Sequence, residues 1–181
     1  PIKQVAVDAG HGGADTGTMS PNGTAEKAIT AAMAVRFEKA LAETGTLSAA
    51  PTRREDKEVS IGDRVLAATS QSAGLLVSLH TGAALSPEAP LIQLYHSTVP
   101  AEGGDLAACA SRAKAVADAM AKALAAGDDA PAVAVRAMPL RLQTAAKMPC
   151  LLIELGSLNQ TDGEALLIAE DRRDALVDRM A

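Results

Sequence analysis

Short, continuously apolar segments alternate with longer segments of helical periodicity along most of this chain. The apolar segments have the length of strands, and the segments between them are long enough for helices of three turns or more. Strands that are apolar on both faces belong to sheets that are covered on both faces, and such sheets are mostly parallel. The sequence therefore predicts an α/β fold: a twisted, mostly parallel sheet flanked by helices on both faces, in a single domain.

The individual elements can be assigned from periodicity and from the residues at their ends. Strands are expected over residues 2–8, 46–51, 75–80, 91–97, 131–136 and 150–155. Helices are expected over residues 26–43, from a Ser60 cap to residue 71, and over 101–126, 163–168 and 171–180. The chain has 181 residues, within the usual range for one domain, so we expect residues 1–181 to form one catalytic domain.

The composition excludes several classes of partner. The formal net charge of -5 argues against nucleic acid and against an electrostatic hold on anionic membranes. The chain has no Trp, and Tyr95 and Phe37 are its two aromatic side chains, so few rings can stack on bases or sugars. No apolar run reaches the length of a membrane helix, which predicts no membrane insertion. No signal peptide precedes the first strand, as expected if a leader or an upstream segment has been removed.

The two cysteines, Cys109 and Cys150, are too few for a disulfide framework. They can form one bridge or remain buried thiols. We favour buried thiols, because a free cysteine often behaves as a small core residue.

Four side chains that can bind a metal or transfer a proton are expected at the same edge of the sheet. Three come from the ends of predicted strands and one from the start of a helix. His11 follows the first strand, His80 ends the third, Glu154 lies near the end of the last, and Glu26 begins the first long helix. Ligands bind beyond the carboxyl ends of strands in open α/β sheets. Two imidazoles and a carboxylate suit a catalytic Zn²⁺, with a further carboxylate acting as base.

Each of these residues also has an ordinary structural explanation. The "GHGG" segment around His11 can be a tight turn with a solvent-facing histidine. Glu26 favours the helix dipole, and His80 can be a hydrogen-bonded core histidine. Glu154 is harder to explain in this way, since a carboxylate is costly to bury without a partner. The third histidine, His96, is expected at the surface or rim of the sheet.

Four ordered motifs resemble a known family. The segments "VAVDAGHGGADTG", "NGTAEK", "SLHTGA" and "MPCLLIELGSLNQ" are similar to those of the zinc-dependent N-acetylmuramoyl-L-alanine amidases, the amidase 3 class of cell-wall hydrolases. The resemblance runs from Val5 to the C-terminal helices. It implies zinc ligands at His11, Glu26 and His80, a catalytic glutamate at Glu154, and hydrolysis of the amide between N-acetylmuramic acid and L-alanine of the stem peptide.

The resemblance also sets expectations for the surroundings of the site. Asp8 or Asp15 is expected to orient His11, although either can instead cap the turn. Arg136 and Arg141 are candidates to meet stem-peptide carboxylates, with plain surface charge as the alternative. The sequence departs from the family pattern at Gly82, where a polar residue is usual, and at Ser157, where an aromatic residue is usual.

Three functional hypotheses follow. The first is a zinc amidase acting on peptidoglycan, gripping the peptide and lactyl arm more than the glycan, in the cell envelope, either periplasmic or extracellular. The second is a catalytically impaired or inactive amidase-like domain that binds cell wall or a regulatory protein partner. The third is a zinc peptidase acting on another amide. Because residues 100–129 leave room for only a modest insertion, we expect an open groove.

Overall fold

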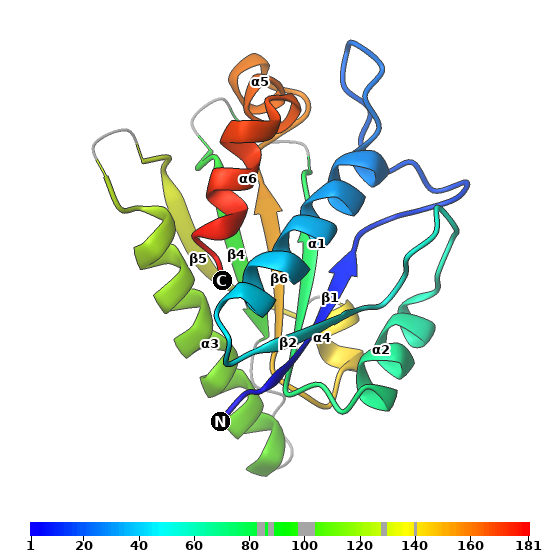
Figure 1. Ribbon diagram of the computed structural model, residues 1–181, viewed down its shortest axis with the longest axis vertical. Coiled ribbons are helices and arrows are strands. Elements are labelled where there is room, and N and C mark those ends of the chain that lie inside the picture. The colour runs from blue at the N-terminus through cyan, green and yellow to red at the C-terminus, as the bar shows by residue number, and fades with distance from the viewer. Residues whose placement is uncertain (83–85, 87–88, 98–103, 128–129, 140) are drawn as a thin grey trace.

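The computed structural model describes residues 1–82, 86, 89–97, 104–127, 130–139 and 141–181, and it forms a six-stranded sheet with helices on both faces (Figure 1). The strands are β1 (Gln4–Ala9), β2 (Ser48–Pro51), β3 (Leu75–His80), β4 (Ile92–Ser97), β5 (Val133–Met138) and β6 (Cys150–Leu155). The helices are α1 (Glu26–Glu43), α2 (Ile61–Ser70), α3 (Gly104–Leu124), α4 (Arg141–Ala145), α5 (Thr161–Ile168) and α6 (Glu170–Asp178).

The sheet has the strand order β2-β1-β3-β6-β4-β5. Every neighbouring pair is parallel except β4 and β6, which run antiparallel. The prediction of a mostly parallel, helix-flanked sheet is confirmed. The carboxyl ends of β1, β3 and β6 therefore lie side by side at one edge.

Two layers of helices cover the sheet, as predicted. On one face α1 contacts β1, β2 and β3, while α3 contacts β4, β5 and β6 and α6 packs against α1. The main core lies there, and Met33, Phe37 and Leu94 are fully buried in it. On the other face α2 contacts β1 and β2, and α4 contacts β4 and β6, over a smaller cluster around Leu76 and Cys150.

The expected place of His96 at the surface or rim is wrong. His96 is only 9% exposed. Alternate positions of a strand share one face, so His96 lies on the same buried face of β4 as Ile92 and Leu94. That face is covered by α3. Its Nδ1 lies 3.1 Å from the backbone carbonyl oxygen of Ser97.

The start of α2 confirms the sequence prediction, and other features differ from it. Helix α2 begins as predicted, with the Ser60 hydroxyl accepting from the Asp63 amide. Helix α4 was not predicted, because its five residues are too few to show a helical period.

Both cysteines are free thiols, of which Cys150 is buried and Cys109 is only half-buried. Burial raises the pKa of the Cys150 thiol. Residues 100–103 and 128–129 of the expected insertion region lie outside the described residues.

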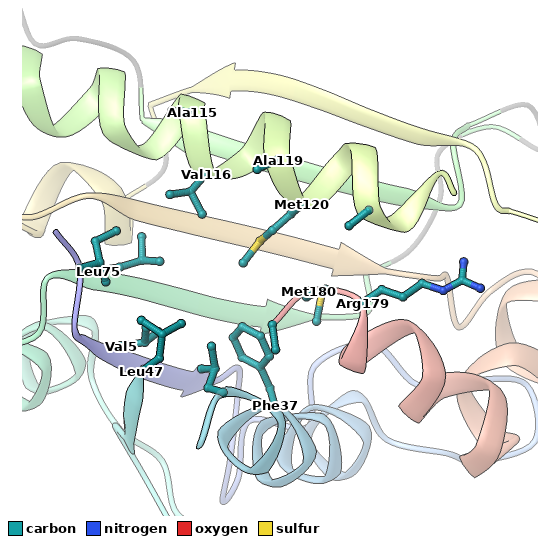
Figure 2. Close-up of a pocket in the computed structure, with 14 residues that line it drawn as sticks. Val5, Phe37, Leu47, Leu75, Ala115, Val116, Ala119, Met120, Arg179 and Met180 are labelled. Atoms are coloured by element: carbon teal, nitrogen blue, oxygen red, sulfur yellow. The ribbon is translucent and has the colours of Figure 1, made fainter. Parts of the chain in front are cut away.

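An apolar cavity of about 420 Å³ lies on the face covered by α1 and α3 (Figure 2). Its walls include Val5, Phe37, Val116 and Met120, and Arg179 supplies the charged side chain among them. It brings together no histidines or carboxylate side chains, so the chemistry predicted above has to lie elsewhere. No helix in the described part of the chain is long and apolar enough to cross a membrane.

The core predicts the cost of truncating a central leucine. Leu94 is fully buried in β4, so Leu94→Ala is expected to lower the free energy of unfolding by about 2–5 kcal/mol, through lost burial and the cavity left behind. Leu66→Ala is the matched control, because Leu66 is 65% exposed on α2. Urea denaturation measures both. Equal losses in the two variants would contradict the described packing of β4.

Candidate metal centre

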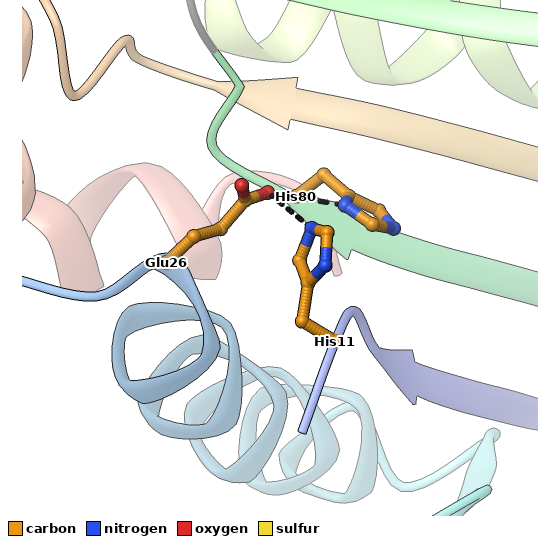
Figure 3. A group of neighbouring side chains, drawn as sticks. All are labelled: His11, Glu26 and His80. Atoms are coloured by element: carbon orange, nitrogen blue, oxygen red, sulfur yellow. Dashed lines mark hydrogen bonds and ion pairs between the residues drawn. The ribbon is translucent and has the colours of Figure 1, made fainter. Parts of the chain in front are cut away.

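Three side chains from distant parts of the sequence meet beyond the carboxyl ends of β1 and β3 (Figure 3). His11 follows β1, His80 ends β3, and Glu26 is the first residue of α1. The Oε1 atom of Glu26 lies 3.2 Å from Nε2 of His11 and 3.1 Å from Nδ1 of His80. One carboxylate oxygen therefore faces a nitrogen of each imidazole.

The spacing of these donor atoms fits a tetrahedral zinc ion. Metal–ligand bonds of 2.0–2.1 Å in a tetrahedron separate the ligand atoms by about 3.3 Å, close to the two distances above. The two imidazole rings meet edge to face, with centroids 4.9 Å apart and an interplanar angle of 82°. One potential donor atom from each of the three residues lies within 4.8 Å of the others. The geometry and the chemistry of the donors therefore both suit Zn²⁺.

Glu26 stays ionised although the protein buries it. Its second oxygen, Oε2, accepts from the Thr18 amide at 2.9 Å, and Oε1 accepts from the Thr81 amide at 2.9 Å. Burial opposes the charged form, but the hydrogen bonds with His11, His80 and these two amides outweigh it and hold the pKa of Glu26 far below its usual range. The Glu26 carboxylate thus keeps a negative charge, which favours a cation.

His11 is oriented by a second carboxylate. Its Nδ1 lies 2.9 Å from Oδ2 of Asp15, so that Nε2 faces Glu26. The hydrogen bond with Glu26 is the main cause that raises the pKa of His11 to about 9; burial opposes it and Asp15 adds to it. A metal that binds Nε2 has to displace this proton.

Of the two aspartates considered for this role, Asp15 contacts the histidine. Asp8 is only 1% exposed and its carboxylate binds the Ser78 hydroxyl at 2.6 Å, the Arg64 guanidinium at 2.7 Å and the Thr52 hydroxyl. Asp8 therefore belongs to a buried network beneath the site, and Asp15 is the outer partner of His11.

Close approach of backbone to the His80 ring explains the glycine before His11. A Cβ atom at Gly10 would lie 2.4 Å from Cε1 and 2.6 Å from Nε2 of His80. A side chain at this position would overlap the His80 ring, so the ring or the backbone would have to move. The turn after β1 thus needs a glycine for the packing of His80.

Glu154 lies beside the three-residue cluster rather than within it. It is the cross-strand neighbour of His80 in the parallel pairing of β3 and β6. The Gly82 amide donates to its Oε2 atom, and a Cβ at Gly82 would lie 2.8 Å from that oxygen. Burial raises the pKa of Glu154, with the charge of His80 opposing the shift. The position suits a group that exchanges a proton next to a metal.

The two arginines predicted to contact substrate lie in different places. Arg141, on α4, lines a cavity of about 290 Å³ together with His11, His80 and Asp15. Arg136 is exposed on β5, opposite Tyr95 of β4, and does not line that cavity. The structure therefore brings Arg141, but not Arg136, to the same cavity as the two histidines.

Comparisons with known proteins identify the family. The family model described as "N-acetylmuramoyl-L-alanine amidase" matches residues 5–181. The chain belongs to this family.

Individual relatives agree with the family match. Escherichia coli N-acetylmuramoyl-L-alanine amidase AmiA is 36% identical over 85 residues, which are 47% of this chain and 29% of AmiA. The amidase AmiC2 of Nostoc punctiforme superposes with a TM-score of 0.84 at 21% identity, covering 98% of this chain and 92% of that chain. The catalytic domain of CwlV, from Bacillus (Paenibacillus) polymyxa, gives 0.79 at 26% identity, covering 99% and 94%. The chain spans about a third or less of the length of the named amidases among its curated relatives.

Two residues next to the site of this amidase-family chain are not identified by the sequence analysis. Arg53 and Arg64 are each 7% exposed and bind carbonyls of the turn that carries His11. The "TRRED" segment, residues 52–56, contains the first of them. A single sequence does not show whether an arginine is buried. The "TRRED" segment alone therefore did not identify Arg53 as a residue of the site.

The packing at Gly10 predicts an effect on metal binding. Gly10→Ala is expected to lower the affinity for Zn²⁺ by about 10-fold or more, because it displaces the His80 ring. Gly62→Ala is the control, since its new Cβ would meet only Ser60 Oγ, at 3.7 Å. Competition with a chromophoric chelator measures the affinity. Parental affinity in folded Gly10→Ala would show that His80 does not bind the metal as described.

Proposed function

We propose that this chain hydrolyses the amide between the lactyl group of N-acetylmuramic acid and L-alanine of the peptidoglycan stem peptide. The observation that carries the proposal is the meeting of His11, Glu26 and His80 around one point, with Glu154 on the neighbouring strand. Family membership supports the same reaction. Acyl transfer from an amide needs an electrophilic carbonyl, an activated water and a proton for the leaving amine.

In this proposal Nε2 of His11, Nδ1 of His80 and a carboxylate oxygen of Glu26 hold Zn²⁺. When bound, the ion polarises the scissile carbonyl and makes water more acidic. Asp15 fixes the ring of His11, and the amides of Thr18 and Thr81 fix the carboxylate of Glu26. The chain's own residues thus hold the donors in place before the metal arrives.

Glu154 acts as the general base and then as the general acid. Its carboxylate accepts a proton from the attacking water and delivers it to the departing amine of L-alanine. Burial raises its pKa, which brings a carboxyl group closer to the range in which it can both take and give a proton. The Gly82 amide orients one oxygen, Oε2, and leaves Oε1 for the proton transfer.

The departures at Gly82 and Ser157 are compatible with catalysis. Gly82 contacts Glu154 through its backbone amide, and the absence of a side chain leaves room for the Glu154 carboxylate. Ser157 is buried, and its hydroxyl donates to Oδ1 of Asn159 at 2.5 Å. Neither change removes a proposed ligand or the proposed base.

Substrate contacts are proposed to come from the face of the sheet that carries Glu154. Arg141, at the cavity that contains the histidines, meets a carboxylate of the stem peptide. Arg136, further out on β5, is the second and more distant candidate. Phe37 is in the core, and Tyr95 is half-buried, so stacking on sugars contributes little. Recognition therefore depends on the peptide and the lactyl arm.

The remaining proposals concern the setting of the enzyme. We propose that residues 1–181 form one catalytic domain that works on peptidoglycan in the cell envelope, on the periplasmic or extracellular side. A regulatory protein partner stays a prediction. The inactive, wall-binding alternative is decided by the experiment that follows.

The central experiment is mass spectrometry of purified peptidoglycan treated with this chain. The products are expected to be free stem peptides that begin with L-alanine, and a chelator is expected to abolish them because Zn²⁺ is removed. Cell-wall binding without any product would support the inactive alternative. Cleaved glycan would overturn the proposed reaction.

Glu154→Gln is expected to lower hydrolysis by about 10²–10⁴-fold while zinc binding is kept, because proton transfer is lost but no ligand is removed. Glu43→Gln is the matched control, since Glu43 is exposed at the end of α1. Initial rates and zinc content are measured together. Unchanged turnover in Glu154→Gln would remove this residue from the mechanism.

Arg141→Met is expected to raise the KM for stem-peptide substrates by about 10-fold, with a smaller effect on kcat, because one charge-assisted contact to a carboxylate is lost. Arg112→Met, exposed on α3, serves as the control. An unchanged KM would leave Arg141 as plain surface charge.

A further inference from the structure

Two buried guanidinium groups lie beneath the turn that carries His11. Arg53 and Arg64 are each 7% exposed. A cation is costly to bury unless its donors are paired, and the proposed reaction gives neither arginine a chemical step. Their hydrogen bonds indicate what they do.

Arg64, on α2, binds the turn on both sides of Gly10. Its Nη1 donates to the Ala9 carbonyl and to Oδ1 of Asp8, each at 2.7 Å, and its Nη2 donates to the His11 carbonyl at 2.8 Å. Its Nε donates to the Val59 carbonyl at 3.0 Å. One planar fork therefore binds the backbone two residues before the metal-facing histidine and at the histidine itself.

Arg53 connects the same turn to the helix that carries Glu26. Its Nε donates to the Ala9 carbonyl at 2.9 Å, and its Nη2 donates to the Gly10 carbonyl at 3.0 Å and to the Lys27 carbonyl at 3.4 Å. Lys27 directly follows Glu26. The side chain thus sets the end of β1 against the first turn of α1.

The backbone of His11 needs this support. Its φ of +60° lies in the left-handed region, which costs a residue with a side chain about 1 kcal/mol or more. Such a conformation persists only when its surroundings determine it. Here it turns the imidazole so that Nε2 reaches Oε1 of Glu26.

We propose that Arg64, assisted by Arg53, is a positioning residue of the metal centre: it holds His11 in the left-handed conformation that aims Nε2 at the metal. This inference rests on the proposed function, in which His11 is a zinc ligand. Arg64 also lines the cavity that contains His11, His80 and Arg141, but in this proposal it acts through the backbone of His11.

Arg64→Met tests the proposal against Arg173→Met. Arg173 is a buried arginine of α6, 8% exposed, which binds Asp174 and the Leu167 carbonyl. Zinc affinity, measured by chelator competition, is expected to fall about 10–100-fold in Arg64→Met and to stay at the parental value in Arg173→Met. The thermal stability of both metal-free variants is measured in parallel. Equal zinc affinities in the two folded variants would overturn the proposal.

Arg64→Lys keeps the test valid if Arg64→Met does not fold. An ammonium group retains the charge beside Asp8 but cannot span the Ala9 and His11 carbonyls as a planar fork does. Its zinc affinity is expected to lie between those of the parent and Arg64→Met, or below the parent where Arg64→Met is unfolded. Parental affinity in Arg64→Lys would overturn a role for the fork.

A second readout separates this proposal from the proposed function. The Gly12 amide donates to the Asp15 carbonyl at 2.9 Å, and the Gly13 amide donates to Oδ1 of Asp56 at 2.8 Å. Both amides are followed in protein from which zinc has been removed. Hydrogen exchange of these amides is expected to be about 10-fold faster in Arg64→Met than in Arg173→Met, with core amides as reference. If the unsubstituted protein neither binds zinc nor hydrolyses peptidoglycan, the proposed function is refuted, but the exchange rates still test whether Arg64 holds the turn around His11. Equal exchange rates in Arg64→Met and Arg173→Met would overturn the positioning role of Arg64.

Discussion

The shared contact of the Glu26 carboxylate with two imidazoles is the interaction on which the rest of the site depends. One oxygen lies 3.2 Å from His11 and 3.1 Å from His80, so a single buried charge sets the position of both rings. This arrangement is possible because β1 and β3 are neighbours in a parallel sheet and α1 begins, with Glu26, near their carboxyl ends. The fold thus supplies the convergence, and the ionised carboxylate supplies the attraction for a cation.

A second layer of buried charge supports this first one. Asp8, Arg53 and Arg64 connect β1, α2 and the segment after β2 to the backbone of the turn around His11. Each charge is satisfied by several hydrogen bonds, as burial requires. We infer that rigidity beneath the site is what lets His11 occupy a conformation that its own backbone disfavours.

The sequence was sufficient for the fold class and for the proximity of His11, Glu26 and His80, for physical reasons. Apolar strands and amphipathic helices show their periods directly, and the end of a parallel strand is where His11, His80 and Glu154 were expected to meet. It was not sufficient where the answer depends on packing between distant segments. His96 is buried rather than at the surface or rim, α4 is too short to show a helical period, and Arg53 and Arg64 give no sign in the sequence that they are buried. The choice between Asp8 and Asp15 likewise needed three-dimensional contacts.

We propose that His11, Glu26 and His80 together bind one zinc ion. The most direct measurement is anomalous diffraction from crystals of zinc-loaded protein, recorded on both sides of the zinc absorption edge. A single strong anomalous peak is expected about 2.0–2.2 Å from Nε2 of His11, Nδ1 of His80 and a carboxylate oxygen of Glu26. A peak bound to other residues, or none in protein saturated with zinc, would contradict the proposal.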